Sequence, residues 1–146
     1  MKVIADACAW SVSLRRRNKT VLSPVEQSVH AELMEALGDG RIILIGPIRQ
    51  EVLSGIKSAA QFEQVRAALE AFPDEPITTQ QYEEAARLFN LCRSRGVECG
   101  STDILICSIA AQRQWSILTY DKGLQRCVEV LRAEGISLQG PQADAI

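Results

Sequence analysis

The sequence predicts an α/β fold in which a short, mostly parallel sheet is flanked by helices. Three short apolar segments have the length of strands: KVIAD at residues 2–6, RIILI at residues 41–45 and SILT at residues 116–119. Longer segments with helical spacing of their apolar residues lie between them. Strands that alternate with helices in this way are typical of a parallel sheet covered by helices.

The first strand and the first long helix have clear boundary signals. KVIAD has a charged start, a β-branched apolar centre and Asp6 at its end. Ser23 and Glu26 form a capping box, and Pro24 takes the first position of a helix whose apolar residues recur every fourth position. We expect the longest loop between these elements, near residues 11–22.

The middle of the chain predicts a second strand and three helices. The continuous apolar run RIILI fits a strand that is buried on both faces. A short helix over IRQEVLSGI follows Gly46-Pro47, and residues 59–72 predict an amphipathic helix. A third helix extends from a cap at Thr78 or Thr79 to Gly96.

The last part of the chain continues the alternation. Ser101 is expected to cap the helix that carries ILICSIAA. SILT predicts a strand, LQRCVEVLRAEG a helix, and ISLQ a last short strand. The final residues, GPQADAI, predict a loose tail.

The length of 146 residues suits one domain over residues 1–146, with a core over about residues 2–138. No apolar run approaches the roughly 18 residues that a membrane-spanning helix needs. The first residues, MKVIADACAW, are too short and too acidic for a signal peptide. We therefore expect a cytoplasmic protein.

The cysteine count and the net charge narrow the function classes. The five cysteines are odd in number and none are spaced as C-x-x-C, which predicts buried reduced thiols instead of a disulfide framework or a zinc site. The net charge of −2 provides no global field for nucleic acid. A polyanion would have to meet a local patch, and the densest basic run contains Arg15, Arg16, Arg17 and Lys19.

Four acidic residues occupy corresponding places in the predicted fold. Asp6 ends the first strand, and Asp121 follows SILT. Asp103 lies in the first turn of a helix that must run antiparallel to the strands, and Glu51 lies on the helix after RIILI. All four are therefore expected at the carboxyl edge of the sheet, where α/β proteins bind their ligands.

Each acid has a simpler alternative when it is taken alone. Asp103 could complement the helix dipole, Asp121 could cap the next helix, and Glu51 could be a solvated helix residue. Asp6 is harder to explain in this way, because a carboxylate after a buried strand is costly unless it is paired. Converging carboxylates also repel one another, and hard oxygen ligands suit Mg²⁺ or Mn²⁺.

These segments resemble the motifs of PIN-domain nucleases. MKVIADACAW resembles the family's opening, IRQEVLSGI its second motif with Glu51 as the acid, and STDILICSIAAQRQWSILTYDKGL its third and fourth motifs. Asp103 matches the acid that starts the helix, and Thr119 and Asp121 match the T-x-D after the strand. The resemblance extends over roughly residues 2–138 and implies a PIN-like three-layer sandwich.

Chains of this size in the family are most often VapC-type toxins. The resemblance implies an endoribonuclease that uses one or two Mg²⁺ or Mn²⁺ ions, forms a homodimer and pairs with a small antitoxin. Two positions depart from the family pattern. Gly123 stands where many members have a further acid, which puts a second metal ion in doubt, and Cys8 stands where many have serine.

The resemblance suggests a role for each candidate residue. Asp6, Asp103 and Asp121 would hold a metal ion that activates water, and Glu51 would hold a second ion or orient the water. Thr119 and Cys8 would support these ligands, and the basic run from Arg15 to Lys19 would hold the RNA backbone.

Other mechanisms and functions remain as alternatives. His30 is the only histidine, so a two-histidine mechanism is not available within one chain. His30 is expected to face solvent or to pack in the middle of the first long helix, which argues against a Ser-His-Asp triad. A phosphoryl-transfer α/β domain is a further alternative. The phosphatase type needs a second acid where Cys8 stands, and the receiver type needs an aspartate after RIILI, where Gly46-Pro47 stands. A catalytically inert PIN-fold module that binds RNA or protein is the remaining alternative.

Overall fold

The computed structural model describes residues 1–15 and 21–140 as a small parallel sheet between two groups of helices. The strands are β1 (Val3–Ala5), β2 (Ile42–Ile43) and β3 (Ser116–Leu118). They pair in the order β2-β1-β3, and both pairings are parallel. Ile4 of β1 lies opposite Ile43 on one side and Ile117 on the other.

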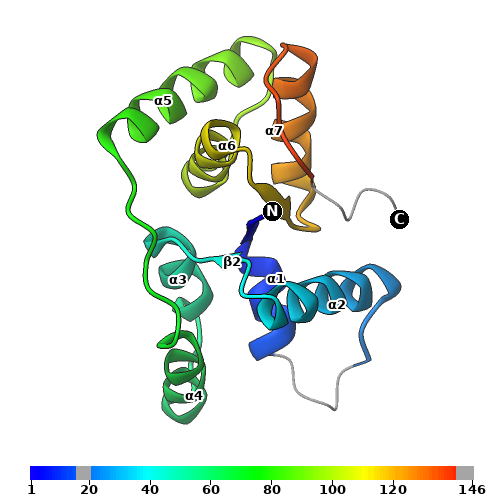
Figure 1. Ribbon diagram of the computed structural model, residues 1–146, viewed down its shortest axis with the longest axis vertical. Helices are drawn as coiled ribbons and strands as arrows, with labels where there is room; N and C mark the ends of the chain where they lie inside the picture. Colours follow the sequence, from blue (N-terminus) through cyan, green and yellow to red (C-terminus); the bar gives the residue numbers. More distant parts are fainter. Residues whose placement is uncertain (16–20, 141–146) are drawn as a thin grey trace.

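The helices divide into two groups around the strands. They are α1 (Ala7–Leu14), α2 (Pro24–Gly38), α3 (Gly46–Leu53), α4 (Ala59–Leu69), α5 (Thr79–Ser94), α6 (Ser101–Arg113) and α7 (Lys122–Ala133). In Figure 1, helices α5, α6 and α7 lie above the strands, whereas α1 to α4 lie below them. The predicted α/β sandwich with a short parallel sheet is thereby confirmed.

The core joins both helical groups to the sheet. Ile4 and Ile117 of the strands, Trp10 of α1 and Ile106 of α6 are each at most 1% exposed. All belong to one cluster of buried apolar side chains that also includes residues of α2, α3, α4, α5 and α7. This shared burial fixes the strand ends relative to the helices. None of the described helices is long and apolar enough to cross a membrane.

The best-marked predicted helix forms as its boundary residues indicate. Ser23 caps α2, its hydroxyl accepts from Glu26 N–H, and the Glu26 carboxylate accepts from Ser23 N–H in return. Val29 and Leu33 of the periodic apolar face are buried. The helix predicted to begin after a cap at Thr78 or Thr79 also forms, and Thr78 is the N-cap of α5.

Several predicted element boundaries need correction. Residues 11–14 belong to helix α1, so the loop expected near residues 11–22 begins later. Strand β2 is limited to Ile42–Ile43, and ISLQ contributes only an isolated bridge between Gln139 and Ser116. Of the predicted tail GPQADAI, the structure describes Gly140, and residues 141–146 lie outside the described part of the chain.

Two local predictions were wrong for identifiable reasons. Gly100, and not Ser101, is the N-cap of α6, because Ser101 already lies in the first turn. Cys99 and Cys127 form a disulfide, whereas Cys8, Cys92 and Cys107 are free thiols. The expectation of reduced cysteines used spacing along the chain, which does not reveal that the loop before α6 packs against α7.

Candidate active site

Asp6 is a buried carboxylate at the point where β1 ends and α1 begins. It is 4% exposed and caps α1, since its Oδ1 accepts the Ala7 N–H at 2.8 Å. Its Oδ2 accepts the Thr119 hydroxyl at 2.8 Å. Burial nevertheless raises the pKa of Asp6, and the charge of Asp121 raises it further. The hydrogen bonds thus offset only part of the cost of placing a charge here.

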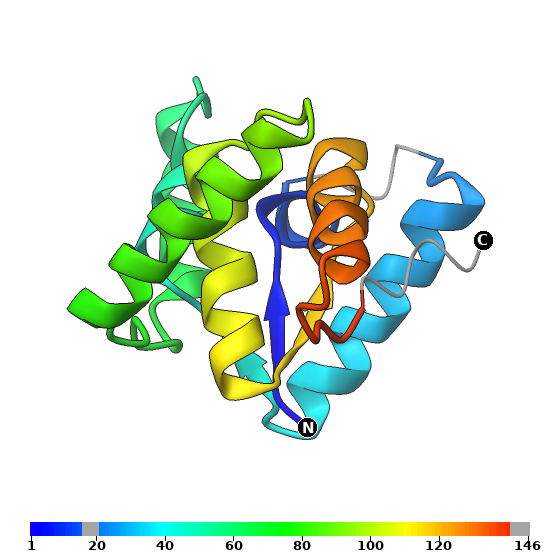
Figure 2. The ribbon, with the colours of Figure 1, turned by 90° about the horizontal axis from the view of Figure 1, so that it is seen from above.

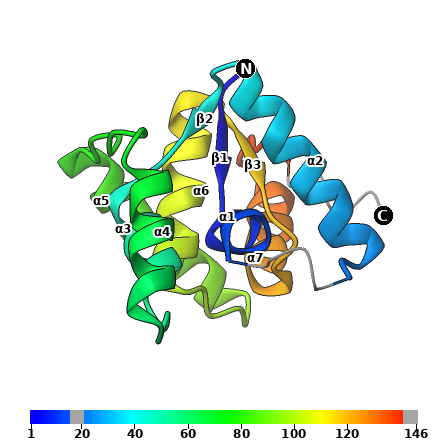
Figure 3. The same ribbon diagram turned by 90° about the horizontal axis from the view of Figure 1, so that it is seen from below.

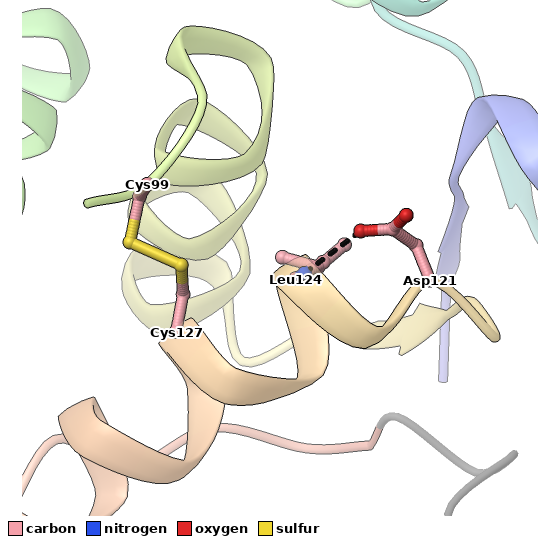
Figure 4. Close-up of a disulfide and its surroundings, with 4 residues drawn as sticks. All are labelled: Cys99, Asp121, Leu124 and Cys127. Atoms are coloured by element: carbon pink, nitrogen blue, oxygen red, sulfur yellow. Dashed lines mark hydrogen bonds between the residues drawn. A yellow bond between two sulfur atoms is a disulfide. The ribbon is translucent and has the colours of Figure 1, made fainter. Parts of the chain in front are cut away.

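Asp121 lies beside Asp6 at the end of β3. Its Oδ2 caps α7 by accepting the Leu124 N–H at 2.9 Å, as Figure 4 shows. Its own N–H donates to Thr119 Oγ1 at 2.9 Å. The Thr119 hydroxyl therefore donates to one acidic residue and accepts from the backbone of the other. β1 and β3 both point toward this junction with α1 and α7 (Figure 3).

Asp103 approaches the same edge from another direction. Helix α6 runs antiparallel to the strands, and its first turn, which includes Asp103, lies toward their carboxyl ends (Figure 2). Burial raises the pKa of Asp103 to about 7, with further contributions from the charges of Asp6, Asp121 and Glu51. No described cation or hydrogen-bond donor counteracts these effects. Among the four acids, Asp103 therefore has the least stabilisation of its negative charge by neighbouring groups.

Glu51 completes the group from helix α3. Its side chain is exposed, yet partial burial and the charges of Asp6 and Asp121 raise its pKa. Acids from four separate segments thus act on one another electrostatically at the carboxyl edge of the sheet. We refer to Asp6, Glu51, Asp103 and Asp121 as the acidic cluster.

Gly123 lies inside this arrangement. A Cβ at this position would lie 3.1 Å from Asp121 Oδ2 and 4.0 Å from Asp103 Oδ2. A side chain at residue 123 would therefore enter the space between two members of the acidic cluster. An acidic side chain at this position could therefore provide a further carboxylate to the site, and glycine provides none.

Cys8 touches the buried side of the acidic cluster. Its Sγ lies 3.6 Å from Asp6 Oδ2 and 3.3 Å from Thr119 Oγ1, and it accepts the Tyr120 N–H at 3.5 Å. Burial, and then the charge of Asp6, raise the pKa of this thiol to about 12. Cys8 is therefore protonated at neutral pH and donates its one S–H to Asp6 Oδ2, so it is no candidate nucleophile.

The donor chemistry of the acidic cluster fits a hard divalent cation, although the ligands are not preset. Carboxylate oxygens in mutual repulsion gain most from a nearby cation. Among the described residues, however, no three His, Cys, Asp or Glu side chains are already arranged around one point. Asp6 and Asp121 each direct an oxygen to a helix N–H. Both oxygens of Asp6 already accept hydrogen bonds, so an ion would have to share these oxygens with their present donors.

The residues expected to bind the RNA backbone either lie away from the acidic cluster or fall outside the described residues. Arg15 lies at the far end of α1 from Asp6, while Arg16, Arg17 and Lys19 lie outside the described residues. His30 pairs with Ser13 across α2 and α1, with His30 Nδ1 2.7 Å from Ser13 Oγ. Its place in helix packing agrees with the expectation from the sequence.

A polar pocket that includes Tyr120, the residue before Asp121, has no counterpart in the sequence prediction. Its volume is about 350 Å³, and Ser11, Val12, Arg15, Gln61 and Tyr120 line it. These residues come from α1, α4 and the turn before α7, so linear spacing does not connect them. The one feature of the sequence that could have indicated this pocket is Tyr120, an aromatic residue between Thr119 and Asp121.

Comparison with known families gives the chain its class. The model of the PIN domain matches residues 19–129, which is more than half of the chain. The chain therefore belongs to the PIN domain family, a nuclease-type fold whose nucleases typically use divalent metal ions. The match includes Glu51, Asp103 and Asp121 and begins after Asp6. A search of curated proteins gives no match.

Proposed function

We propose that this protein is a Mg²⁺- or Mn²⁺-dependent endoribonuclease that hydrolyses RNA phosphodiester bonds at the acidic cluster. The supporting observation is the raised pKa of Asp103, to which the charges of Asp6, Glu51 and Asp121 all contribute. Structural acids are normally spread apart or paired with cations, because like charges close together destabilise the fold. Their convergence at the ligand-binding edge of the sheet favours a functional role.

Each residue has a distinct part in this proposal. Asp6, Asp103 and Asp121 would hold the divalent ion, which would supply a lowered water pKa and neutralise charge on the phosphate. Thr119 donates a hydrogen bond to Asp6 Oδ2 and thereby orients that carboxylate. Glu51 is exposed beside the group and would position the attacking water or take part in binding a second ion. Cys8 supports the buried side as a donor.

The experiment compares RNA cleavage by the wild type and by two neutral variants. Asp6→Asn and Asp103→Asn should each reduce cleavage of a single-stranded RNA in Mn²⁺ by at least about 100-fold, the scale of losing a group that stabilises the transition state. Asp39→Asn is a matched control, since it removes an exposed carboxylate at the end of α2. EDTA should abolish wild-type cleavage, and far-UV circular dichroism should be unchanged in all variants.

Equal cleavage by the wild type, Asp6→Asn and Asp103→Asn would overturn this assignment. The alternative is an inert PIN-fold module that binds RNA or protein. The observation that favours it is the lack of a preset ligand group among the described residues. It predicts a folded protein with no cleavage and no divalent-ion binding that depends on Asp6.

We propose further that the nuclease acts as a VapC-type toxin, as a homodimer paired with a small antitoxin. Support comes from the membership of the PIN domain family and from the resemblance of all four motifs. Expression of the wild type should arrest growth, Asp103→Asn should not, and co-expression of a small adjacent gene product should restore growth. Growth arrest by Asp103→Asn at equal protein levels would contradict a toxic nuclease activity.

A further inference from the structure

The pocket formed by Ser11, Val12, Arg15, Gln61 and Tyr120 adjoins the acidic cluster in the sequence, because Tyr120 directly precedes Asp121. Tyr120 follows Thr119 directly, and its N–H donates to Cys8 Sγ, which in turn lies 3.6 Å from Asp6 Oδ2. Ser11 is one turn beyond Cys8 on helix α1. Tyr120 and Ser11 thus bring one end of the pocket close to Cys8, which itself contacts Asp6.

One face of α1 leads away from the acids and into this pocket. Cys8, Ser11 and Arg15 are spaced three and four residues apart, so they lie along the same side of the helix. With a rise of 1.5 Å per residue, Arg15 is about 13 Å from Asp6 along the helix axis. A chain that extends from the acids along this face would meet first a hydroxyl and then a guanidinium.

Tyr120 forms the aromatic wall of the pocket and is held at both ends. Its backbone N–H is bound to Cys8, and its hydroxyl lies 3.4 Å from Glu26 Oε2 at the start of α2. A ring fixed in this way is preorganised for stacking, because little side-chain entropy remains to be lost.

The opposite side of the pocket is closed by helix α4. Gln61 Nε2 donates to the Arg15 backbone oxygen at 3.0 Å and so ties α4 to the end of α1. Arg15 makes no ion pair with any acid in the described part of the chain. An aromatic ring, a hydroxyl, an amide and a guanidinium together suit a nucleotide better than an apolar peptide.

We propose that this pocket binds a nucleotide of the single-stranded RNA beside the scissile bond, with its base on Tyr120 and a backbone phosphate at Arg15. The volume of about 350 Å³ lies within the range of small-ligand sites. The inference rests on the proposed nuclease function. It adds a positioning site that selects unpaired RNA, because a base must leave its stack to reach the ring.

The test measures binding of a fluorescein-labelled, unstructured oligoribonucleotide by anisotropy. Asp103→Asn serves as the background, so that binding is recorded without cleavage. In that background Tyr120→Leu should weaken binding about 5- to 100-fold, the effect of losing one stacked base, whereas Tyr120→Phe should change it less than about twofold. Ser11→Leu, which fills the pocket, should also weaken binding, and Ser11→Ala should not.

The salt dependence tests the phosphate contact separately. Arg15→Gln should reduce the slope of log Kobs against log salt concentration by about 0.7, the effect of one fewer single-strand phosphate contact. Arg93→Gln on exposed α5 removes the same charge elsewhere and should leave the slope unchanged. In the cleaving protein, Ser11→Leu should raise KM more than it lowers kcat.

The outcomes separate this inference from the function on which it rests. If the wild type cleaves RNA but Tyr120→Leu and Ser11→Leu bind RNA as tightly as Tyr120→Phe and Ser11→Ala, the pocket does not bind a nucleotide and the assignment is wrong. If the wild type neither cleaves nor binds RNA, the nuclease proposal itself fails.

Discussion

The Asp103 carboxyl, with its pKa raised from 3.8 to about 7, links the fold to the pH of the solution. Below about pH 4 this carboxyl is protonated in both the folded and the unfolded protein, so it does not lower the free energy of unfolding. Between pH 4 and 7 the folded protein holds a proton that the unfolded chain releases, so the free energy of unfolding falls as pH rises. Above about pH 7 the cost is complete and constant.

Removing this charge should therefore stabilise the metal-free protein. In EDTA at pH 8, Asp103→Asn should raise the free energy of unfolding by about 1 to 2 kcal/mol, a value discounted because the carboxylate is only half-buried and solvent screens it. The gain should shrink as pH is lowered toward 4. Guanidinium unfolding at several pH values measures both effects, with Asp39→Asn as the control.

A lower stability of Asp103→Asn at pH 8, or a pH profile parallel to that of the wild type, would show that Asp103 bears no electrostatic cost. The acidic cluster would then lose its main physical support. The substitution itself should leave the fold intact, because Asp103 makes no hydrogen bond that holds α6 in the described structure.

At the scale of the elements, the disulfide between Cys99 and Cys127 is a covalent link that constrains the unfolded chain. The disulfide connects the loop before α6 to helix α7 (Figure 4). Asp103 lies in the first turn of α6, and Asp121 is the N-cap of α7. The disulfide closes a loop with a sequence separation of 28 residues, for which chain entropy gives an upper limit of about 3 to 4 kcal/mol. A reduced protein should therefore unfold more readily.

Dithiothreitol should lower the free energy of unfolding of the wild type toward that of Cys99→Ser/Cys127→Ser. The double variant should itself be insensitive to dithiothreitol, which controls for effects on the free thiols. Paired guanidinium titrations provide the measurement. An unchanged wild-type midpoint in dithiothreitol would contradict a stabilising disulfide.

The elements that the sequence predicted correctly are those with strong local signals. The capping boxes at Ser23 and Thr78 locate α2 and α5, because the two reciprocal hydrogen bonds involve residues three apart. Helix α1 was missed because both Ala9 and Trp10, adjacent in sequence, are buried, so the segment lacks an amphipathic period. The cap that starts α1 is Asp6, which the sequence had assigned only to the end of a strand.

At the scale of the whole molecule, the position of the acids followed from topology, whereas the pocket beside them did not. Parallel strands bring their carboxyl ends to one edge, and this rule alone predicts that Asp6 and Asp121 lie at the same edge of the sheet. The pocket depends on how α4 packs against the end of α1, through contacts such as that of Gln61 with Arg15. Contacts of this kind between distant helices leave no periodic mark in the sequence.

The global arrangement also explains why the acids tolerate their repulsion. Asp6 lies in a core in which Ile4, Ile117 and Trp10 are almost fully buried, so its backbone position is set by packing and not by its charge. The stability of the core offsets the cost at the edge. A cation bound there would recover part of this cost, which connects stability to function.

Calorimetric titration of the purified protein with Mn²⁺ tests the central claim most directly. The account predicts heat from a divalent-ion site in the wild type, with binding lost or at least about tenfold weaker in Asp6→Asn and unchanged in Asp39→Asn. If the wild type shows no binding, or if Asp6→Asn binds Mn²⁺ as the wild type does, the acidic cluster is not a metal site.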